Sequence, residues 1–578
     1  MSDLPPIITA EAAVKSKRPG FASIFDPQTD VTRIQDIKQF YADPQLMKEA
    51  VTELKKAGFR VLDSDRISLT ISGPVELFEQ QFNVAIISTE QGLTCEGVAQ
   101  IGYINTDESA FSGVLAGIAL PRNAILNGAT PPTKKAWPQL YPWEVPFRLG
   151  GENFSPKVLQ RFVLTSHVRN RQIRVAVIDT GFHQNHPYFT ENNKEQLGNV
   201  KLDIFRGSTD EFVLQLKQRI QKIYLLLEKA GDIKNLALSS SESIDSLNQR
   251  RDELTNELLA SLKEYLSKAD QAILENKPKL VDLVQFMERK KATYIDLLSR
   301  EKLAKTKPDY NGHGTLVTSL LLAFIKNTGA ALDVCKATTR SLENSFFTAL
   351  ARKPDIVTCS MGAAVSQSVT TDEYLKTGPI IYRKYHQTIQ EAAAEGRAII
   401  FATGNLGEAR ENLRVMEPQW PFVIAVGGAH RGDVATEVIA SDIAQGYALP
   451  NRYVPDVCGL AGPEGKDLHV LPNPDDDWED ADGSSLAAPQ IAGICVFIKL
   501  IYPAADWQEM KYILTSSCDE ITGGKSADGV DLSRLKTSFP DGTVKGIGLA
   551  NLERALYLAV SRAAGAAKEH SRKANTKQ

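Results

Sequence analysis

A serine set between small residues, Ser485, is the residue best placed for nucleophilic chemistry. It belongs to the stretch Gly483-Ser484-Ser485-Leu486-Ala487-Ala488-Pro489, and an apolar run over residues 491–498 follows. This pattern predicts a buried helix with the serine near its N-terminus, where backbone N–H groups and the helix dipole favour negative charge. Such a serine can attack a carbonyl carbon if a base lies within reach. For this stretch alone, helix capping by serine is the alternative.

A carboxylate stands at the end of an apolar run elsewhere in the chain. The residues Arg174-Val175-Ala176-Val177-Ile178-Asp179 predict a buried parallel strand that delivers Asp179 at its C-terminal end. Ligands of parallel sheets bind beyond these strand ends. Helices alternate with further expected strands, so we expect an α/β fold with a doubly wound, mostly parallel sheet. The further strands are expected over residues 331–335, 355–360, 398–401 and 422–426.

Four segments resemble the active-site motifs of the subtilisin-like serine peptidases, the subtilases. They are Val177-Ile178-Asp179-Thr180-Gly181, Asn311-Gly312-His313-Gly314-Thr315, Ala402-Thr403-Gly404-Asn405 and the serine stretch. The resemblance covers a catalytic domain over residues 171–560, interrupted by an insertion over residues 208–308. It implies the subtilisin-like fold and a peptidase that acts on protein or peptide substrates.

The resemblance also implies a role for each motif residue. Ser485 is the nucleophile, His313 takes its proton, and Asp179 holds the imidazole in the required tautomer. Asn405 donates its side-chain amide to the oxyanion, together with the Ser485 backbone N–H. The segment Ser360-Met361-Gly362 matches the family's substrate-binding strand, which is expected to pair with an extended peptide.

The serine motif departs from the family pattern at two positions. Ser484 replaces threonine and Leu486 replaces methionine, so a hydroxyl and the side-chain volume are retained.

The insertion over residues 208–308 departs from the family's spacing, because family members join the aspartate and histidine motifs by a much shorter segment. It is charged, poor in glycine and carries apolar residues at spacings of three and four. This pattern predicts three amphipathic helices in a hairpin or three-helix coiled coil. Such an insertion either docks an activator, a substrate or a second copy, or fills its apolar stripe internally.

Residues 31–120 predict a small domain with the β-α-β-β-α-β order of ferredoxin-like folds, with strands expected over 32–38 and 84–88. Residues 1–30 show no clear periodicity and are expected to be a partly disordered N-terminal extension. A resemblance to the pro-domains of kumamolisin-like and subtilisin-like peptidases rests on residues 57–61 and 69–75, with Phe78 and Phe82. In those families the pro-domain assists folding and covers the active site. An unrelated ferredoxin-like module is the alternative.

Two further segments are expected outside the folded domains. Residues 121–170 contain seven prolines and predict an extended connector. The connector either lies in the substrate groove as a product-like strand or packs Trp137 and Trp143 on the next domain. Residues 561–578 carry five basic residues and few apolar ones, which predicts a disordered tail.

Composition limits the class of partner. The 578 residues are 43% apolar and 24% charged with a net charge of −4, so we expect no nucleic acid partner. No uncharged apolar run reaches membrane-spanning length, and the first thirty residues lack the apolar segment of a secretory signal. We therefore expect a soluble cytoplasmic protein with no membrane partner. Six cysteines without metal-ligand spacing indicate reduced thiols.

No metal or cofactor is predicted. His183 and His186 lack an evident third ligand. The acidic run over residues 475–482 selects basic substrate residues, binds calcium or is simply solvated. Calcium sites occur in the family, but this chain shows no diagnostic calcium loop.

These observations predict an intracellular subtilisin-like serine endopeptidase, made as a self-inhibited zymogen and regulated through its helical insertion. Residues 31–120 would cap the groove. The alternative is a catalytically silent protease-fold scaffold or partner-binding protein. An α/β-hydrolase is disfavoured, because that fold orders its triad as serine, acid and histidine around a G-x-S-x-G elbow.

Overall fold

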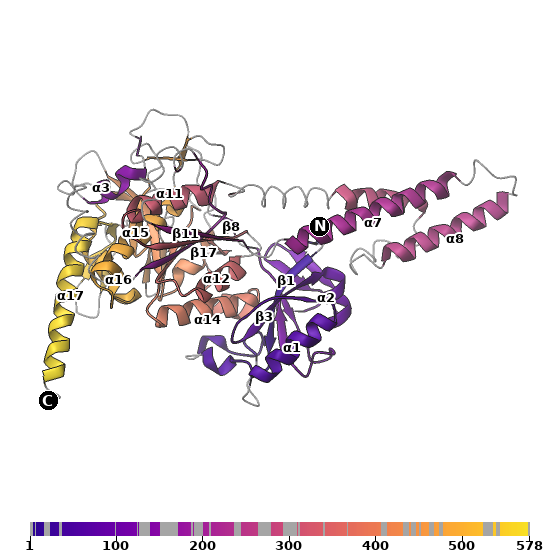
Figure 1. Ribbon diagram of the computed structural model, residues 1–578, viewed down its shortest axis with the longest axis horizontal. Coiled ribbons are helices and arrows are strands. Elements are labelled where there is room, and N and C mark those ends of the chain that lie inside the picture. Colours follow the sequence, from indigo (N-terminus) through magenta and orange to yellow (C-terminus); the bar gives the residue numbers. More distant parts are fainter. Residues whose placement is uncertain are drawn as a thin grey trace. The chain divides into compact units, whose positions relative to one another are not determined.

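The structure is a computed structural model with two compact units (Figure 1). The first unit comprises Met1–Asn123, Ser208–Lys307 and Asp372–Lys384, and the second comprises Ala124–Gly207, Pro308–Thr371 and Tyr385–Gln578. The structure describes residues 4–5, 7–16, 23–33, 37–98, 100–123, 125–126, 139–140, 142–150, 172–186, 189, 200–206, 210–235, 244–263, 279–292, 309, 312–338, 342–366, 368–405, 413–431, 438–440, 447–449, 452–461, 468–472, 478–481, 483–523, 536–538 and 544–575.

The second unit is built on a ten-stranded sheet. Its strands are β10 (Arg174–Asp179), β11 (Lys201–Arg206), β12 (Ala331–Lys336), β13 (Ile356–Cys359), β16 (Ala398–Ala402), β18 (Ile424–Arg431), β19 (Val438–Ala440), β22 (Val457–Leu460), β25 (Asp519–Glu520) and β28 (Gly548–Leu549). Their order is β11-β12-β10-β13-β16-β18-β22-β28-β25, with β19 paired to β18. Only β25 and β19 pair antiparallel. The predicted mostly parallel α/β sheet is therefore confirmed.

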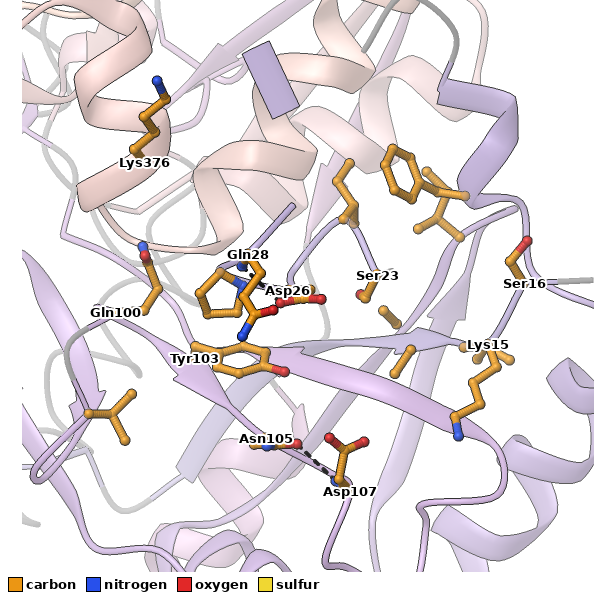
Figure 2. Close-up of a pocket in the computed structure, with 18 of the residues that line it drawn as sticks. Lys15, Ser16, Ser23, Asp26, Gln28, Gln100, Tyr103, Asn105, Asp107 and Lys376 are labelled. Carbon is orange, nitrogen blue, oxygen red and sulfur yellow. Dashed lines mark hydrogen bonds between the residues drawn. The ribbon is translucent and has the colours of Figure 1, made fainter. Parts of the chain in front are cut away.

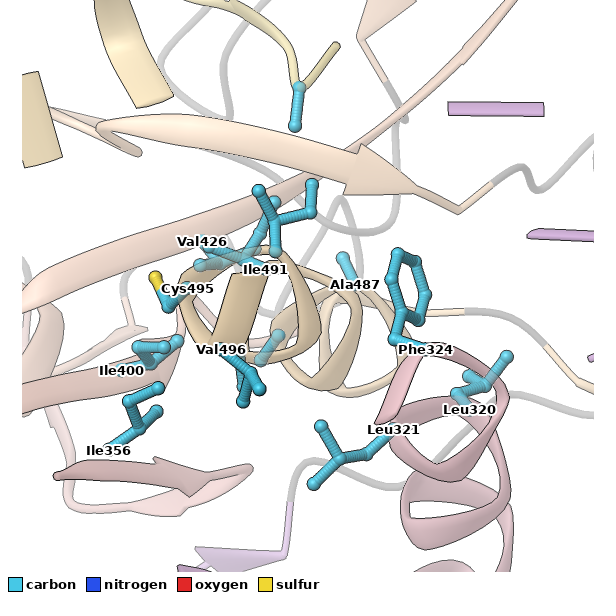
Figure 3. Close-up of a cluster of buried hydrophobic side chains, with 14 of the residues drawn as sticks. Leu320, Leu321, Phe324, Ile356, Ile400, Val426, Ala487, Ile491, Cys495 and Val496 are labelled. Carbon is cyan, nitrogen blue, oxygen red and sulfur yellow. The ribbon is translucent and has the colours of Figure 1, made fainter. Parts of the chain in front are cut away.

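The core of the second unit is centred on α15 (Ser484–Ile501), the helix predicted from the serine stretch. Figure 3 shows side chains of α15 beside those of the sheet and of α11 (His313–Ile325). The labelled residues of the cluster are Leu320, Leu321, Phe324, Ile356, Ile400, Val426, Ala487, Ile491, Cys495 and Val496. By length and composition α15 could cross a membrane, but 94% of it is buried inside the structure, as in the core helix of a folded domain.

A histidine is buried in an aromatic cluster of the second unit. His386, on α14 (Ile381–Ala394), packs edge-on against Trp420 and Phe422, with ring centroids 4.9 and 5.1 Å apart. Burial lowers the pKa of His386 to about 3, because an imidazolium would lose its hydration there. The folded protein therefore keeps this imidazole neutral at pH values that protonate an exposed histidine.

His386 is expected to make the second unit sensitive to acid. The unfolded chain binds a proton at His386 below about pH 6.5, whereas the folded chain binds it only near pH 3. The free energy of unfolding should therefore fall as the pH drops from about 6.5 towards 3, by up to about 1.4 kcal/mol per pH unit. His386→Phe should flatten this dependence in denaturant unfolding measured across that range. Equal pH slopes for variant and wild type would contradict the assignment.

The first unit contains a five-stranded antiparallel sheet. Its strands are β1 (Ile7–Val14), β2 (Arg60–Ser64), β3 (Ser68–Pro74), β6 (Tyr103–Ile104) and β7 (Leu115–Ala119), in the order β2-β3-β1-β7-β6. The helices α1 (Pro44–Lys56) and α2 (Val75–Phe82) follow β1 and β3. With β7 as the fourth strand, the chain order is the β-α-β-β-α-β order of ferredoxin-like folds.

One strand prediction and one boundary in this unit are wrong, and the strand predicted over residues 84–88 is present as β4 (Ile86–Thr89) but lies outside the five-stranded sheet. Where the structure describes them, residues 32–38 belong to two short 3-10 helices, Val31–Arg33 and Ile37–Phe40, rather than to a strand, and residues 34–36 lie outside the described residues. The first strand is β1, inside the segment assigned to the N-terminal extension. Seven of its eight residues are buried, so it lacks the alternation that reveals a half-exposed strand. Residues 86–89 pair in a separate hairpin with residues 92–95, and β7 takes the expected place of that strand in the sheet.

Residues 372–384 belong to the first unit and carry two buried cations. Lys384, at the start of α14, lies 2.7 Å from Glu11 and 2.5 Å from Asp65. Burial would lower the pKa of Lys384, but the two carboxylates outweigh it and the pKa is raised. Arg383 donates to backbone oxygens of Asp26 and Leu375 at 2.5 and 2.8 Å. These contacts join residues 372–384 to the N-terminal sheet.

The insertion is helical where the structure describes it. Its helices are α7 (Asp210–Asn235), α8 (Ile244–Lys263) and a third over residues 280–292. One buried cluster draws on all three, with Leu226 from α7, Leu258 from α8 and Leu283 from the third. The apolar stripe is thus filled, at least in part, within the insertion. Residues 264–278 and 293–308 lie outside the described residues.

The tail prediction is wrong for residues 561–575. Helix α17 (Leu552–Asn575) continues through them. Its first turns bury Leu552, Ala555 and Leu556, and alanine and basic residues with high helix propensity extend it. The charge of the segment therefore did not indicate disorder. Most of the connector over residues 121–170, Trp137 included, lies outside the described residues, and Trp143 is 38% exposed.

A cavity of about 1050 Å³ lies in the first unit (Figure 2). Lysine and aspartate side chains of both charges line it, among them Lys15, Asp26, Asp107 and Lys376. None of the predicted catalytic residues lines this cavity.

Candidate active site

Asp179 is buried at the C-terminal end of β10, between β12 and β13. Its Oδ1 atom lies 2.7 Å from Nδ1 of His313 and accepts the Thr180 backbone N–H at 2.8 Å. The side chain is 0% exposed and that of His313 is 3% exposed. The structure therefore joins two of the three predicted triad residues directly.

His313 is the first residue of α11. The turn before it needs Gly312, which has a φ of 90°, a region that favours glycine. The turn after it needs Gly314, since a Cβ there would lie 2.1 Å from the Gly181 carbonyl oxygen. The glycines of the histidine motif thus let the helix start approach the turn that follows Asp179. Asn311 of this motif lies outside the described residues.

Ser485 lies in the first turn of α15, as predicted, and is buried. Its backbone carbonyl accepts a hydrogen bond from Ser360 Oγ at 3.1 Å. Among the residues that the structure describes, no partner hydrogen-bonds to the Ser485 hydroxyl. Ser485 and His313 therefore form no hydrogen bond with each other in this structure.

Asn405 is held against the serine motif by Ser484. Its Oδ1 accepts the Ser484 backbone N–H at 2.8 Å and the Ser484 hydroxyl at 2.9 Å. The same hydroxyl accepts the Gly404 N–H at 3.0 Å. A backbone N–H can only donate, so these contacts fix the amide oxygen towards Ser484 and leave Nδ2 as the outward donor. The hydroxyl retained at position 484 thus orients the predicted oxyanion donor.

The predicted substrate-binding segment lies beside the serine. Ser360 contacts the Ser485 backbone, and the next two residues form β14 (Met361–Gly362). Strand β8 (Ile125–Leu126) of the connector pairs antiparallel with β14. Gly362 faces Ile125 and Met361 faces Leu126 in this register. A connector segment therefore occupies the edge at which an extended peptide was expected to bind.

Other candidate groups do not join this site. Cys458 is buried on β22, and burial raises the pKa of its thiol well above its usual range, so it is no ready thiolate. In the described part of the chain, no three histidine, cysteine, aspartate or glutamate side chains are grouped to hold a metal ion. Residues 478–481 of the acidic run form a strand paired with residues 469–472, and residues 475–477 and 482 lie outside the described residues.

Asp309 is a site residue that the sequence reasoning missed. Its buried carboxylate accepts hydrogen bonds from Thr180, Gly312 and Thr315, on both sides of the Asp179–His313 pair. Its position four residues before His313, at the end of the insertion, was the signal available in the sequence.

A comparison of the sequence with protein-family models identifies the family of this chain. The peptidase S8 model, described as the subtilase family, matches residues 170–543, more than half of the chain. The chain belongs to the subtilase family. The fold and serine-peptidase relationship predicted from the motifs are thereby confirmed.

Two solved structures are similar to this chain but share little of its sequence. The serine protease of Staphylococcus aureus that processes the epidermin leader peptide is similar at 12% identity in two crystal structures. The match to its mutant form has a TM-score of 0.46 and covers 90% of this chain and 98% of the other. The second has a TM-score of 0.45 and covers 96% and 98%. Among curated proteins, none matches the chain.

Gly483→Ala is expected to destabilise the subtilase site. Gly483 has a φ of 129°, and a Cβ there would lie 2.4 Å from Asn405 Nδ2. Strain of this kind costs about 1–3 kcal/mol. Gly565→Ala on α17 is the matched control, because nothing lies within 4 Å of its Cβ position, and it should stabilise the helix by about 0.5–1 kcal/mol. Thermal unfolding measures both, and a Gly483→Ala protein as stable as wild type would refute the contact.

Proposed function

We propose that the protein is an intracellular serine endopeptidase that hydrolyses peptide bonds through an acyl-enzyme on Ser485. The observation that carries the proposal is the buried hydrogen bond between Asp179 and His313 in a subtilase whose serine begins a core helix. The intracellular setting is supported by six cysteines that are all free, since disulfides are rare in reducing compartments.

The contact with Asp179 assigns the imidazole its role. An ionised carboxylate only accepts hydrogen bonds, so Nδ1 of His313 carries a proton and Nε2 is left as the base. Nε2 takes the proton of Ser485 as its Oγ attacks the substrate carbonyl carbon, and later gives that proton to the leaving amine. Asp179 stabilises the imidazolium that forms between these steps. Water then repeats the sequence on the acyl-enzyme.

The oxyanion of the tetrahedral intermediate needs fixed donors. Nδ2 of Asn405 and the backbone N–H of Ser485 fill this role in the proposal, because Ser484 holds the amide in one orientation. The N-terminal end of α15 adds a favourable dipole. Loss of one such donor costs on the order of 100–1,000-fold in turnover.

Ser485→Ala is expected to abolish peptide hydrolysis and labelling by a fluorophosphonate, because both need the Ser485 hydroxyl. Ser366→Ala, at an exposed position of the same unit, is the matched control and should keep both. Mass spectrometry of the purified proteins reports labelling and any self-cleavage together. Wild-type protein that takes no label and cuts no peptide would favour the catalytically silent scaffold instead.

The pairing of β8 with β14 supports self-inhibition. Backbone hydrogen bonds bind an extended peptide whatever its side chains, so the connector competes with substrate for this edge. Self-cleavage is therefore expected within the connector that carries β8.

Leu126→Pro is expected to weaken this inhibition, because proline lacks a backbone donor and restricts the strand. Hydrolysis of an added peptide should rise and self-cleavage should fall. Leu140→Pro is the matched control, since β9 (Gln139–Leu140) pairs with residues 468–469 instead. Activity assays and mass spectrometry measure both effects. Identical activities for the two variants would argue against occupation of the substrate edge by β8.

Regulation through the insertion is part of the same proposal. The insertion exposes Tyr224, Leu225 and Val281 to 53%, 51% and 61%, although its buried cluster is filled internally. These apolar side chains suit contact with an activator, a protein substrate or a second copy.

A further inference from the structure

One buried carboxylate near the triad has no role in the chemistry described above. Asp309 is 1% exposed, and each of its oxygens accepts two hydrogen bonds. Oδ1 accepts the Thr180 hydroxyl at 2.7 Å and the Gly312 N–H at 2.9 Å. Oδ2 accepts the Thr315 N–H at 2.6 Å and the Thr315 hydroxyl at 2.7 Å. A carboxylate that receives four donors is strongly held in one position.

These donors come from the two segments that carry Asp179 and His313. Thr180 directly follows Asp179, and its hydroxyl also accepts the Gly314 N–H at 2.8 Å. Gly312 and Thr315 flank the first turn of α11, and the Thr315 N–H is shared between Asp309 and the Gly312 carbonyl oxygen. A β-bridge between Gly181 and Asp309 adds backbone contact to the same turn. Asp309 therefore hydrogen-bonds to both of the segments that carry the Asp179–His313 pair.

We propose that Asp309 is a positioning residue, which sets the His313 imidazole against Asp179. This inference rests on the proposed peptidase function for its kinetic consequence. Catalytic groups need placement within about 0.5 Å, and the Asp179 to His313 contact spans two segments far apart in the sequence. The four hydrogen bonds of Asp309 fix the spacing of these segments. Its negative charge also suits the N-terminal end of α11.

Asp309→Asn tests the role with little change of shape. The amide keeps one acceptor oxygen but turns an NH₂ group towards two donors, so two of the four bonds are lost. We expect kcat to fall roughly 100-fold with KM unchanged. In ¹⁵N-histidine-labelled protein, the NMR signal of the proton that His313 Nδ1 shares with Asp179 should shift or broaden.

Asp506→Asn is the matched control for a purely structural helix cap. Asp506 caps α16 (Trp507–Ser517) in the same unit and accepts the Glu509 N–H at 2.8 Å. Because asparagine caps a helix about as well as aspartate, this variant should change the melting temperature little and leave both kcat and the His313 signal unchanged. If Asp309→Asn behaves like Asp506→Asn in all three measurements, Asp309 is a cap only and the inference is overturned.

Two further arms keep the test decisive. If Asp309→Asn does not fold, Thr315→Val removes the hydroxyl that donates to Asp309 and accepts the His183 N–H, and Thr315→Ser, which keeps both contacts, should restore kcat and the His313 signal. Failure of that rescue would count against positioning by Asp309. If the wild type cuts no peptide, the proposed function fails, but the His313 signal still decides whether Asp309 positions the imidazole.

Discussion

The hydrogen bond between the Asp179 carboxylate and the His313 imidazole constrains the structure around it. Both groups are almost fully buried, and a charge removed from water has to be matched by donors and partners. The parallel sheet supplies one partner at a strand end, and a helix that begins on His313 supplies the other. The two backbones must then approach closely, which explains the glycine on each side of the histidine. The segments that carry Ser485 and Asn405 must also approach closely, and Ser484 joins them by hydrogen bonds to Asn405 and Gly404.

The parts of the fold and site that could be predicted from the sequence are those marked by a short stretch of neighbouring residues. Asp179 ends one apolar segment and Ser485 precedes another, so local patterns located these two residues and the parallel sheet, whereas the resemblance of a short motif to the subtilases located His313. Strand β1 was not predicted because it is buried along nearly its whole length and shows no alternation of apolar and polar residues. The role of Asp309 was not predicted because it depends on Thr180, which precedes it by the whole insertion, and no local pattern indicates a hydrogen bond over that separation. Residues 561–575 were misjudged because their charge was weighed above their helix propensity.

Asp309 directly follows the insertion in the sequence and lies four residues before His313, so the insertion is closely connected to the triad along the chain. The first unit includes residue 307, and the second unit resumes at Pro308, one residue before Asp309. Under the proposed regulation, a partner that displaces the end of the insertion would therefore act directly on Asp309, which accepts hydrogen bonds from Thr180, Gly312 and Thr315. Such coupling requires two arrangements of Asp309 and its hydrogen-bond donors, which the partner binds with different affinity. Regulation through the insertion would then alter the position of His313 rather than access to Ser485.

Self-cleavage within the connector would not by itself release the N-terminal residues. The first unit also contains residues 208–307 and 372–384, which remain joined to the rest of the chain on both sides. Glu11 and Asp65 hold Lys384 within that unit, and leaving a buried cation without its partner costs about 3–5 kcal/mol. A segment held nearby competes with substrate at high effective concentration even when its own bond is cut. Under the proposed self-inhibition, activation would therefore need a second event that loosens the Lys384 contacts, and the cut connector would remain an inhibitor until that event.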